Sequence, residues 1–124
     1  MGWIKSSAKT RKRKRAEVQV IAEVRPKVEE RDGYCRILNY DSEVVLFIGK
    51  CEGPSQWAHL PGHRRSQTRR MPPEERHTTQ GTAMLCLKHH ADEEAHRLLL
   101  LPLTSNGADG PMRLSCNGHA FEEK

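Results

Sequence analysis

A cysteine followed by two histidines, Cys86-x-x-His89-His90, is the feature that most limits what this chain can fold into. Two ligands at this spacing form a knuckle that holds one side of a tetrahedral zinc ion. The other side needs two more ligands, and the upstream cysteines are Cys35 and Cys51. We therefore predict that Cys35, Cys51, Cys86 and His89 bind a structural Zn²⁺ and join distant parts of the chain.

The composition of the chain favours such a site. Its 124 residues are enough for one small domain, and only six of them are aromatic. A core this thin usually depends on a metal or a disulfide. The polar, basic start does not resemble a signal peptide, and no apolar run is long enough to span a membrane. We therefore expect a cytoplasmic protein whose cysteines stay reduced and are free to bind metal.

An alternative interpretation of the cysteines remains open. Buried thiols also serve as small apolar side chains, and Cys116, in a predicted hairpin, is expected to be of that kind. Cys35 and Cys51 are separated by 15 residues, whereas the two ligands of a zinc knuckle are usually separated by two to four.

Basic side chains are concentrated in two parts of the chain. Residues 1–15 hold seven Lys or Arg and no acidic residue, although the net charge of the whole chain is only +5. We expect this segment to be a disordered basic arm, either merely solvated or in contact with nucleic acid phosphates. A second group of arginines stands between residues 60 and 80. The residues expected to contact nucleic acid are Lys12, Arg13, Lys14, Arg15, Arg64, Arg65, Arg69, Arg70 and Arg76.

The hydrophobic pattern predicts a mixture of helices and strands. Residues 16–24 alternate like a strand, although a helical face fits them too, and Pro26 could begin a short helix ending at Gly33. Residues 43–49 are expected to form a strand that pairs with a second strand at residues 56–60.

The second half of the chain is predicted as a loop, a helix and short strands. Residues 61–81 are rich in proline and glycine and read as a long loop, and residues 82–98 have helical composition. The last three apolar runs, separated by SNGADG and NG, predict a C-terminal β-hairpin region.

Four short segments, RDGYC, WAHL, RH and MLCLKHH, stand in an order that resembles the HNH endonucleases, especially small phage and bacterial members. The resemblance covers about residues 31–97. It implies an α+β fold with a small, zinc-stapled, treble-clef-like ββα-metal core. With the C-terminal hairpin, this core would make residues 16–124 a single domain that follows the arm of residues 1–15.

The resemblance also implies roles for individual residues. His59, at the end of the first strand of the motif, corresponds to the general base that activates water against a phosphodiester. His90 corresponds to the helix histidine that binds the catalytic metal, expected to be Mg²⁺ or Mn²⁺, with Zn²⁺ or Ni²⁺ as alternatives. An imidazole suits this task because it can be neutral near neutral pH.

The chain departs from the family pattern at two positions. Ala58 stands where the family often has a metal ligand, and the middle asparagine is absent, its position falling near Gly81. We therefore expect water and nearby side chains to complete the coordination of His90. The candidates are Glu94, His77 and His63.

Neighbouring histidines on a helix point about 100° apart, so His89 and His90 are expected to serve different sites. Glu94 is four residues after His90 and should share its face. The simpler alternative is that this segment is a solvated helix surface.

The sequence therefore favours a metal-dependent endonuclease that nicks or cuts duplex DNA with little sequence preference, in a bacterial or phage-infected cell. Its expected partner is DNA, with no membrane and no small-molecule cofactor. The main alternative is a zinc-stapled DNA-binding or adaptor module without catalysis. RNA binding is less favoured, because few aromatic side chains are present for base stacking.

Overall fold

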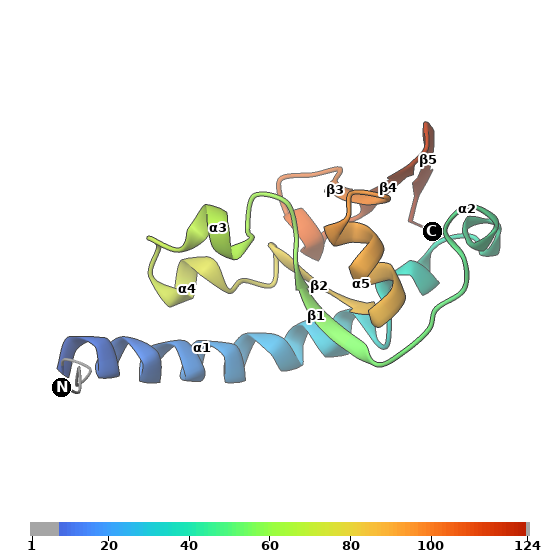
Figure 1. The fold of residues 1–124 in the computed structure, drawn as a ribbon. Helices are drawn as coiled ribbons and strands as arrows, with labels where there is room; N and C mark the ends of the chain where they lie inside the picture. Colours follow the sequence, from blue (N-terminus) through green and yellow to red (C-terminus); the bar gives the residue numbers. More distant parts are fainter. Residues whose placement is uncertain (1–7, 124) are drawn as a thin grey trace, which may run out of the picture.

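The computed structural model describes residues 8–123 and shows an α+β domain with two antiparallel sheets (Figure 1). The first sheet pairs β1 (Ser55–His59) with β2 (Thr82–Cys86), and α5 (Leu87–Glu94) follows β2 directly. The β1–β2 pair lies between α5 and the long helix α1 (Ala8–Asp32), with β2 in contact with both helices. The prediction of an α+β fold is confirmed.

The first element is a helix, not an arm followed by a strand. The least exposed positions of α1, among them Glu17, Ile21, Val24 and Val28, recur at helical spacing, and Val18 of the predicted strand is exposed. Helix-favouring Lys, Arg, Glu and Ala dominate the segment, so the strand-like alternation does not decide its structure. Residues 8–15 of the expected disordered arm are the start of α1, and residues 1–7 lie outside the described residues.

The end of α1 matches the prediction better than its start. Pro26 lies inside the helix rather than at its first turn. The helix stops before Gly33, whose φ of +69° lies in the left-handed region that favours glycine.

The predicted strand at residues 43–49 is wrong. The segment forms two short helices, η2 (Ser42–Val44) and α2 (Val45–Ile48), after an earlier turn, η1 (Arg36–Asn39). Val44 and Ile48 are buried, whereas Val45, Leu46 and Phe47 are exposed. Burial at a spacing of four residues is helical, and this packing outweighs the β-propensity of the segment.

The partner of β1 is therefore β2, in a segment that composition predicted to be helical. All five residues of β2 are buried, because α1 and α5 cover the pair. A strand buried on both faces shows no alternation, so its pattern cannot be distinguished from that of a buried helix. The helix begins only at Leu87, where the Cys86 side chain caps its first turn by accepting from the His89 backbone N–H.

The connection between β1 and β2 contains two single-turn helices, α3 (Arg65–Thr68) and α4 (Pro73–Arg76), within the predicted loop. Contacts of α4 with α3 and with α1 hold this segment beside the long helix.

The C-terminal strands are confirmed. They form one sheet in the order β3 (Leu99–Pro102), β4 (Met112–Cys116) and β5 (His119–Glu122), with η3 (Gly107–Asp109) between the first two. Asn117 and Gly118, with φ of +46° and +82°, make the two-residue turn between β4 and β5.

A buried ionic cluster joins the end of α1 to both sheets. The Asp32 carboxylate accepts from the Met84 backbone N–H at 2.9 Å and pairs with Arg31 and Arg36. Arg36 also donates to Glu123 at 2.7 Å. Within residues 8–123, no helix has the length and apolar composition of a membrane span.

Candidate metal centre and candidate active site

Four potential metal ligands converge at the start of α5, beside the end of β2. They are the side chains of Cys35, Cys51, Cys86 and His89, whose ligand atoms all lie within 4.8 Å of one another. The Nδ1 atom of His89 lies 3.7, 3.6 and 3.2 Å from the three sulfurs, taken in chain order. Zinc with ordinary Zn–S and Zn–N bonds in a tetrahedron would place sulfur and nitrogen about 3.6 Å apart. The cluster therefore fits a tetrahedral Cys₃His zinc site.

The surroundings of His89 favour the metal-binding form of its ring. Its Nε2 atom lies 3.0 Å from the carbonyl oxygen of Gly49, to which an Nε2–H can donate. That donation leaves the Nδ1 lone pair directed at the three sulfurs, as in zinc sites whose histidine donates to a carbonyl. Burial lowers the pKa of His89, which keeps the imidazole neutral as a ligand must be.

Burial has the opposite effect on the thiols. It raises the pKa of Cys35 and Cys51, so the thiolates are disfavoured unless a cation compensates their charge. A bound Zn²⁺ would supply that charge, since a coordinating thiol is deprotonated. Cys116 is buried in β4 and does not belong to the cluster.

The folding of residues 36–50 explains how a ligand pair with a long gap can meet. Cys35 follows the end of α1, and Cys51 follows α2. The intervening segment folds into η1, η2 and α2 and returns the chain to the site. The fold therefore brings together the four residues that the sequence predicted as zinc ligands, and together they could hold a metal ion.

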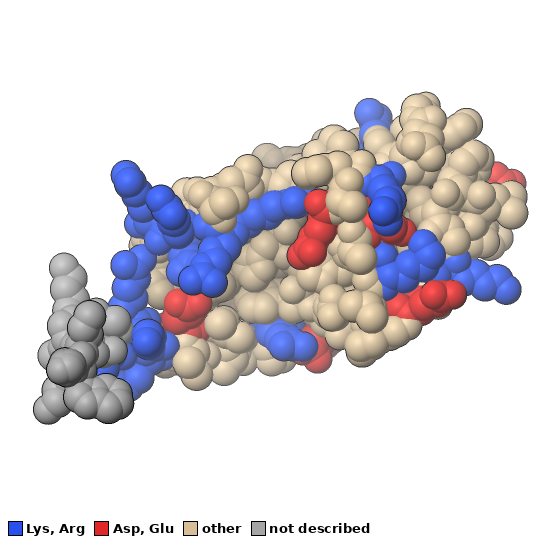
Figure 2. All heavy atoms as spheres, viewed as in Figure 1, with Lys and Arg blue, Asp and Glu red and all other residues tan. Residues whose placement is uncertain are grey.

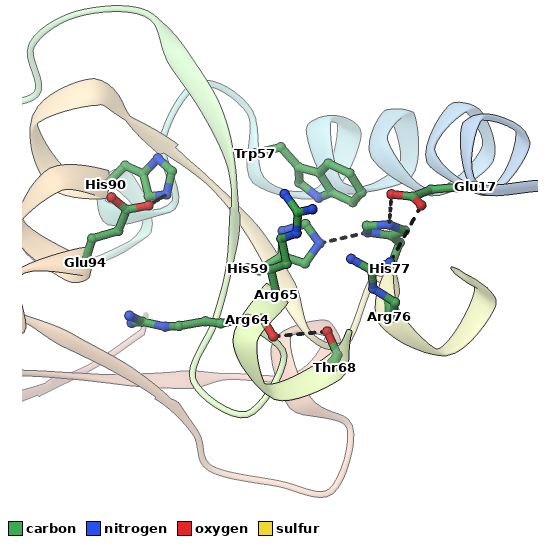
Figure 3. Close-up of a pocket in the computed structure, with 10 residues that line it drawn as sticks. All are labelled: Glu17, Trp57, His59, Arg64, Arg65, Thr68, Arg76, His77, His90 and Glu94. Atoms are coloured by element: carbon green, nitrogen blue, oxygen red, sulfur yellow. Dashed lines mark hydrogen bonds and ion pairs between the residues drawn. The ribbon is translucent and has the colours of Figure 1, made fainter. Parts of the chain in front are cut away.

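A separate cleft of about 610 Å³ lies on the other side of α5. Figure 3 shows the side chains that line it, contributed by α1, β1, α3, α4, α5 and the segments beside them. The lining residues are Glu17, Trp57, His59, Arg64, Arg65, Thr68, Arg76, His77, His90 and Glu94.

His59 lies in this cleft and is hydrogen-bonded to a second histidine. Its Nε2 atom is 2.9 Å from Nδ1 of His77, and Nε2 of His77 is 3.2 Å from a carboxylate oxygen of Glu17 (Figure 3). Both ring nitrogens of His77 therefore have partners. His77 was expected to bind the catalytic metal, but the structure places it beside His59 and in no cluster of three potential ligands within residues 8–123.

His90 and Glu94 lie across the cleft from this pair (Figure 3). Nε2 of His90 is 3.1 Å from a Glu94 oxygen, and Nδ1 is 2.7 Å from the side-chain oxygen of Gln56. His90 thus faces the cleft whereas His89 faces the cysteines, as the 100° offset on a helix predicts. Two of the expected catalytic-metal ligands are together, and their binding of a metal stays a prediction.

The other two positions noted in the sequence are also accounted for. Ala58 is fully buried in the core, because it points to the face of β1 opposite His59. His63 lies against Gly81, where an added Cβ would clash with the imidazole ring of His63. No asparagine could occupy position 81 with His63 placed in this way.

The arginines predicted to contact DNA divide into two groups. Arg64, Arg65 and Arg76 line the cleft, whereas Arg69 and Arg70 are exposed beyond its lining. Figure 2 shows lysine and arginine side chains gathered where the start of α1 meets α3 and α4. Arg13 contributes to that meeting by donating to the backbone oxygens of Arg69 and Met71.

Arg64 and Arg76 are also held by acidic side chains. Arg64 donates to Glu93, a fully buried carboxylate of α5, and Arg76 pairs with Glu17 at 3.6 Å. Arg65 has the more exposed position of the three. Two of the three cleft arginines, Arg64 and Arg76, are thus held in place by acidic side chains of α5 and α1.

Sequence reasoning missed Glu17, Trp57 and Thr68 as lining residues. Trp57 could have been predicted, because residues two apart on a strand share a face. In the structure, the centroid of its ring lies 4.8 Å from that of the His59 ring. Glu17 and Thr68 come from other elements, and only the folded chain brings them to the cleft.

We expect the pKa of His59 to lie well below that of an ordinary histidine. Burial, then the nearby His77 and Arg76, lower its pKa to about 4, so it is neutral throughout the range above pH 5. The rate of any reaction that needs the neutral His59 ring should therefore not change with the titration of this residue between pH 6 and 7. Nitrogen-15 NMR titration of the histidines measures this directly, and a His59 midpoint near 6.5 would contradict it.

No protein-family model, curated protein or solved structure matches this chain. Functional inference therefore depends on the cleft and on the metal centre.

Proposed function

We propose that this protein is a metal-dependent DNA endonuclease of the HNH type. The observation that carries the proposal is the cleft, which places the neutral imidazole of His59 beside three arginines and across from His90 and Glu94. The pairing of β1 with β2 and the helix α5 after them support it, because two paired strands and a helix are the elements of the ββα-metal core that the sequence resemblance implies, although here the loop lies between the strands.

The chain's own residues divide the work in the following way. His59 accepts a proton from water as the water oxygen attacks the phosphorus of the scissile phosphodiester. Arg65 and Arg76 bind the flanking phosphates and fix the strand in the cleft. A divalent cation held by His90, Glu94 and water would neutralise negative charge on the phosphoryl group and the leaving oxygen.

The basic end of the molecule would bind the duplex beyond the cleft. The start of α1, with its exposed lysines and arginines, contacts the segment between α3 and α4 through Arg13, and α4 packs against α1. Contacts with phosphate carry no sequence information, so a cleft and surface of this kind favour low sequence preference.

Plasmid cleavage tests the proposal. Supercoiled plasmid should be converted to nicked or linear DNA in Mg²⁺ or Mn²⁺, and EDTA should stop the reaction. His90→Ala should raise the metal concentration needed for half-maximal rate, because it removes a ligand. A zinc-loaded, folded protein that binds DNA but leaves plasmid intact with either metal would contradict the proposal.

The alternative is a zinc-stapled DNA-binding or adaptor module. It is favoured by one observation, that the cleft offers His90 and Glu94 to a catalytic metal but no third convergent ligand among the described residues. Such a module would bind DNA with the same salt dependence and without cleavage.

Phosphate contact by the start of α1 gives a separate prediction. Lys12→Gln/Lys14→Gln removes two exposed charges and should weaken DNA binding. The slope of log K against log salt should become shallower by up to about 1.8, or about 0.9 per lost contact. Lys27→Gln/Lys50→Gln is the matched control, because these lysines are also exposed but lie away from that end. Equal slopes in both variants would place DNA elsewhere on the surface.

A further inference from the structure

Hydrogen bonds connect Glu17 to His77 and His77 to His59. The three residues come from parts of the chain that are far apart in sequence, because Glu17 is in α1, His77 follows α4 and His59 ends β1. We propose that Glu17 and His77 are positioning residues that fix the tautomer and the orientation of the His59 ring. The inference rests on the proposed function, because it assigns these two residues a purpose in activating His59 as a base.

The position of each proton follows from the order of the groups. An ionised carboxylate only accepts hydrogen bonds, so the Nε2 atom of His77, 3.2 Å from Glu17, carries the proton and donates it. With the proton on Nε2, the Nδ1 atom of His77 carries a lone pair. The Nε2 atom of His59, 2.9 Å away, must donate to that lone pair. The basic lone pair of His59 is consequently on Nδ1.

The surroundings restrict the rings to this arrangement. The side chain of His77 is only 8% exposed, and the Glu17 side chain is 32% exposed. The indole of Trp57 lies 5.5 Å from the His77 ring and 4.8 Å from the His59 ring, measured between centroids. Arg76 holds the second oxygen of Glu17 at 3.6 Å (Figure 3). Glu17 is therefore also paired with Arg76, and the two histidine rings also contact Trp57.

This arrangement has a chemical consequence for the proposed reaction. The proton that leaves water joins Nδ1 of His59, while the remaining hydroxide oxygen forms the bond to phosphorus and the leaving oxygen departs. The Nε2–H of the resulting imidazolium stays hydrogen-bonded to His77, whose own N–H points to the Glu17 carboxylate. His77 and Glu17 thereby hold the His59 ring in one orientation while Nδ1 takes up the proton, as the orienting partner of a catalytic histidine does. No further reactant is needed.

Long-range proton–nitrogen NMR of ¹⁵N-labelled protein at pH 7.5 tests the tautomers without any nuclease assay. His59 and His77 should both be Nε2–H tautomers in the zinc-loaded wild type. Glu17→Ala should turn one or both into tautomer mixtures. The variant is expected to fold, since the side chain is partly exposed and alanine favours helices. Glu23→Ala, an exposed glutamate on the same helix, is the control and should leave both tautomers unchanged.

Two further variants separate positioning from general structural support. Glu17→Gln keeps an acceptor oxygen and should retain both tautomers and most of the cleavage rate, whereas Glu17→Ala should lower kcat roughly 10- to 100-fold with little change in KM. His77→Asn should likewise preserve more activity than His77→Ala, because the amide oxygen can accept from His59. This recovery by conservative variants is not expected of residues that only support the fold.

The outcomes distinguish the two proposals. Nδ1–H on His59 in the wild type, or tautomers unaffected by Glu17→Ala, would overturn the positioning role even if the protein cleaves DNA. The expected tautomers in a protein that never cleaves DNA would support the arrangement and contradict the nuclease. Equal cleavage rates in wild type and Glu17→Ala would also overturn the positioning role.

Discussion

Replacing Cys86 with serine is expected to unfold the domain at room temperature. Cys86 is fully buried, ends β2, caps α5 and contributes one of the three sulfurs around His89. Removing a ligand weakens the metal, and structural zinc sites contribute about 10–16 kcal/mol of apparent binding free energy. Natural domains have a total stability of only about 5–15 kcal/mol. Loss of the zinc therefore exceeds what the thin core can compensate.

The measurement combines metal content with a folding assay. Wild-type protein should carry about one tightly held zinc per chain by elemental analysis, and a strong chelator should unfold it. Cys86→Ser should lose the zinc together with the cooperative thermal transition. Cys116→Ser is the matched control, because Cys116 is also buried but lies outside the cluster, and zinc content should stay unchanged. A folded, soluble wild type without zinc would rule the site out.

The residues that could hold a metal ion were predictable from the sequence, because ligand chemistry restricts such residues to a few types. Cys86 and His89 have knuckle spacing, and only three other cysteines were available to complete the set. What could not be predicted was the route from Cys35 to Cys51. The strand expected there is a set of short helices, since Val44 and Ile48 are the residues that reach the core.

The cleft was predictable only in part. His59, His90 and Glu94 were found because a family resemblance and helix spacing place them, and Arg64, Arg65 and Arg76 because they stand in a basic run. Glu17 was not, since nothing in α1 indicates that this glutamate reaches a histidine 60 residues later in the chain. The ionic contacts of Asp32 and Arg36 could not be predicted from the sequence either, because they depend on how α1 meets both sheets.

Replacing His59 with alanine is expected to lower the rate of DNA cleavage by roughly 10²-fold or more, the usual contribution of a positioned general base. Its lowered pKa keeps the imidazole neutral at working pH, and because Nε2 is engaged by His77, Nδ1 is the nitrogen that would accept the proton in the proposed reaction. Zinc content and DNA affinity should stay near wild type, because His59 belongs neither to the Cys₃His cluster nor to the arginines. The loss should thus appear in kcat rather than in KM.

Plasmid cleavage under single-turnover conditions measures this loss, with proteins purified side by side so that host nuclease contributes equally. His119→Ala, an exposed histidine of β5, is the control and should cleave at the wild-type rate. Added imidazole should restore part of the rate of His59→Ala by supplying the missing base, and it should not accelerate the wild type. Restoration of this kind depends on the space left by the side chain and would not follow from a general loss of structure. If His59→Ala cleaves as fast as the wild type, His59 is not the base, and the fixed tautomer of its ring serves no chemistry in this cleft.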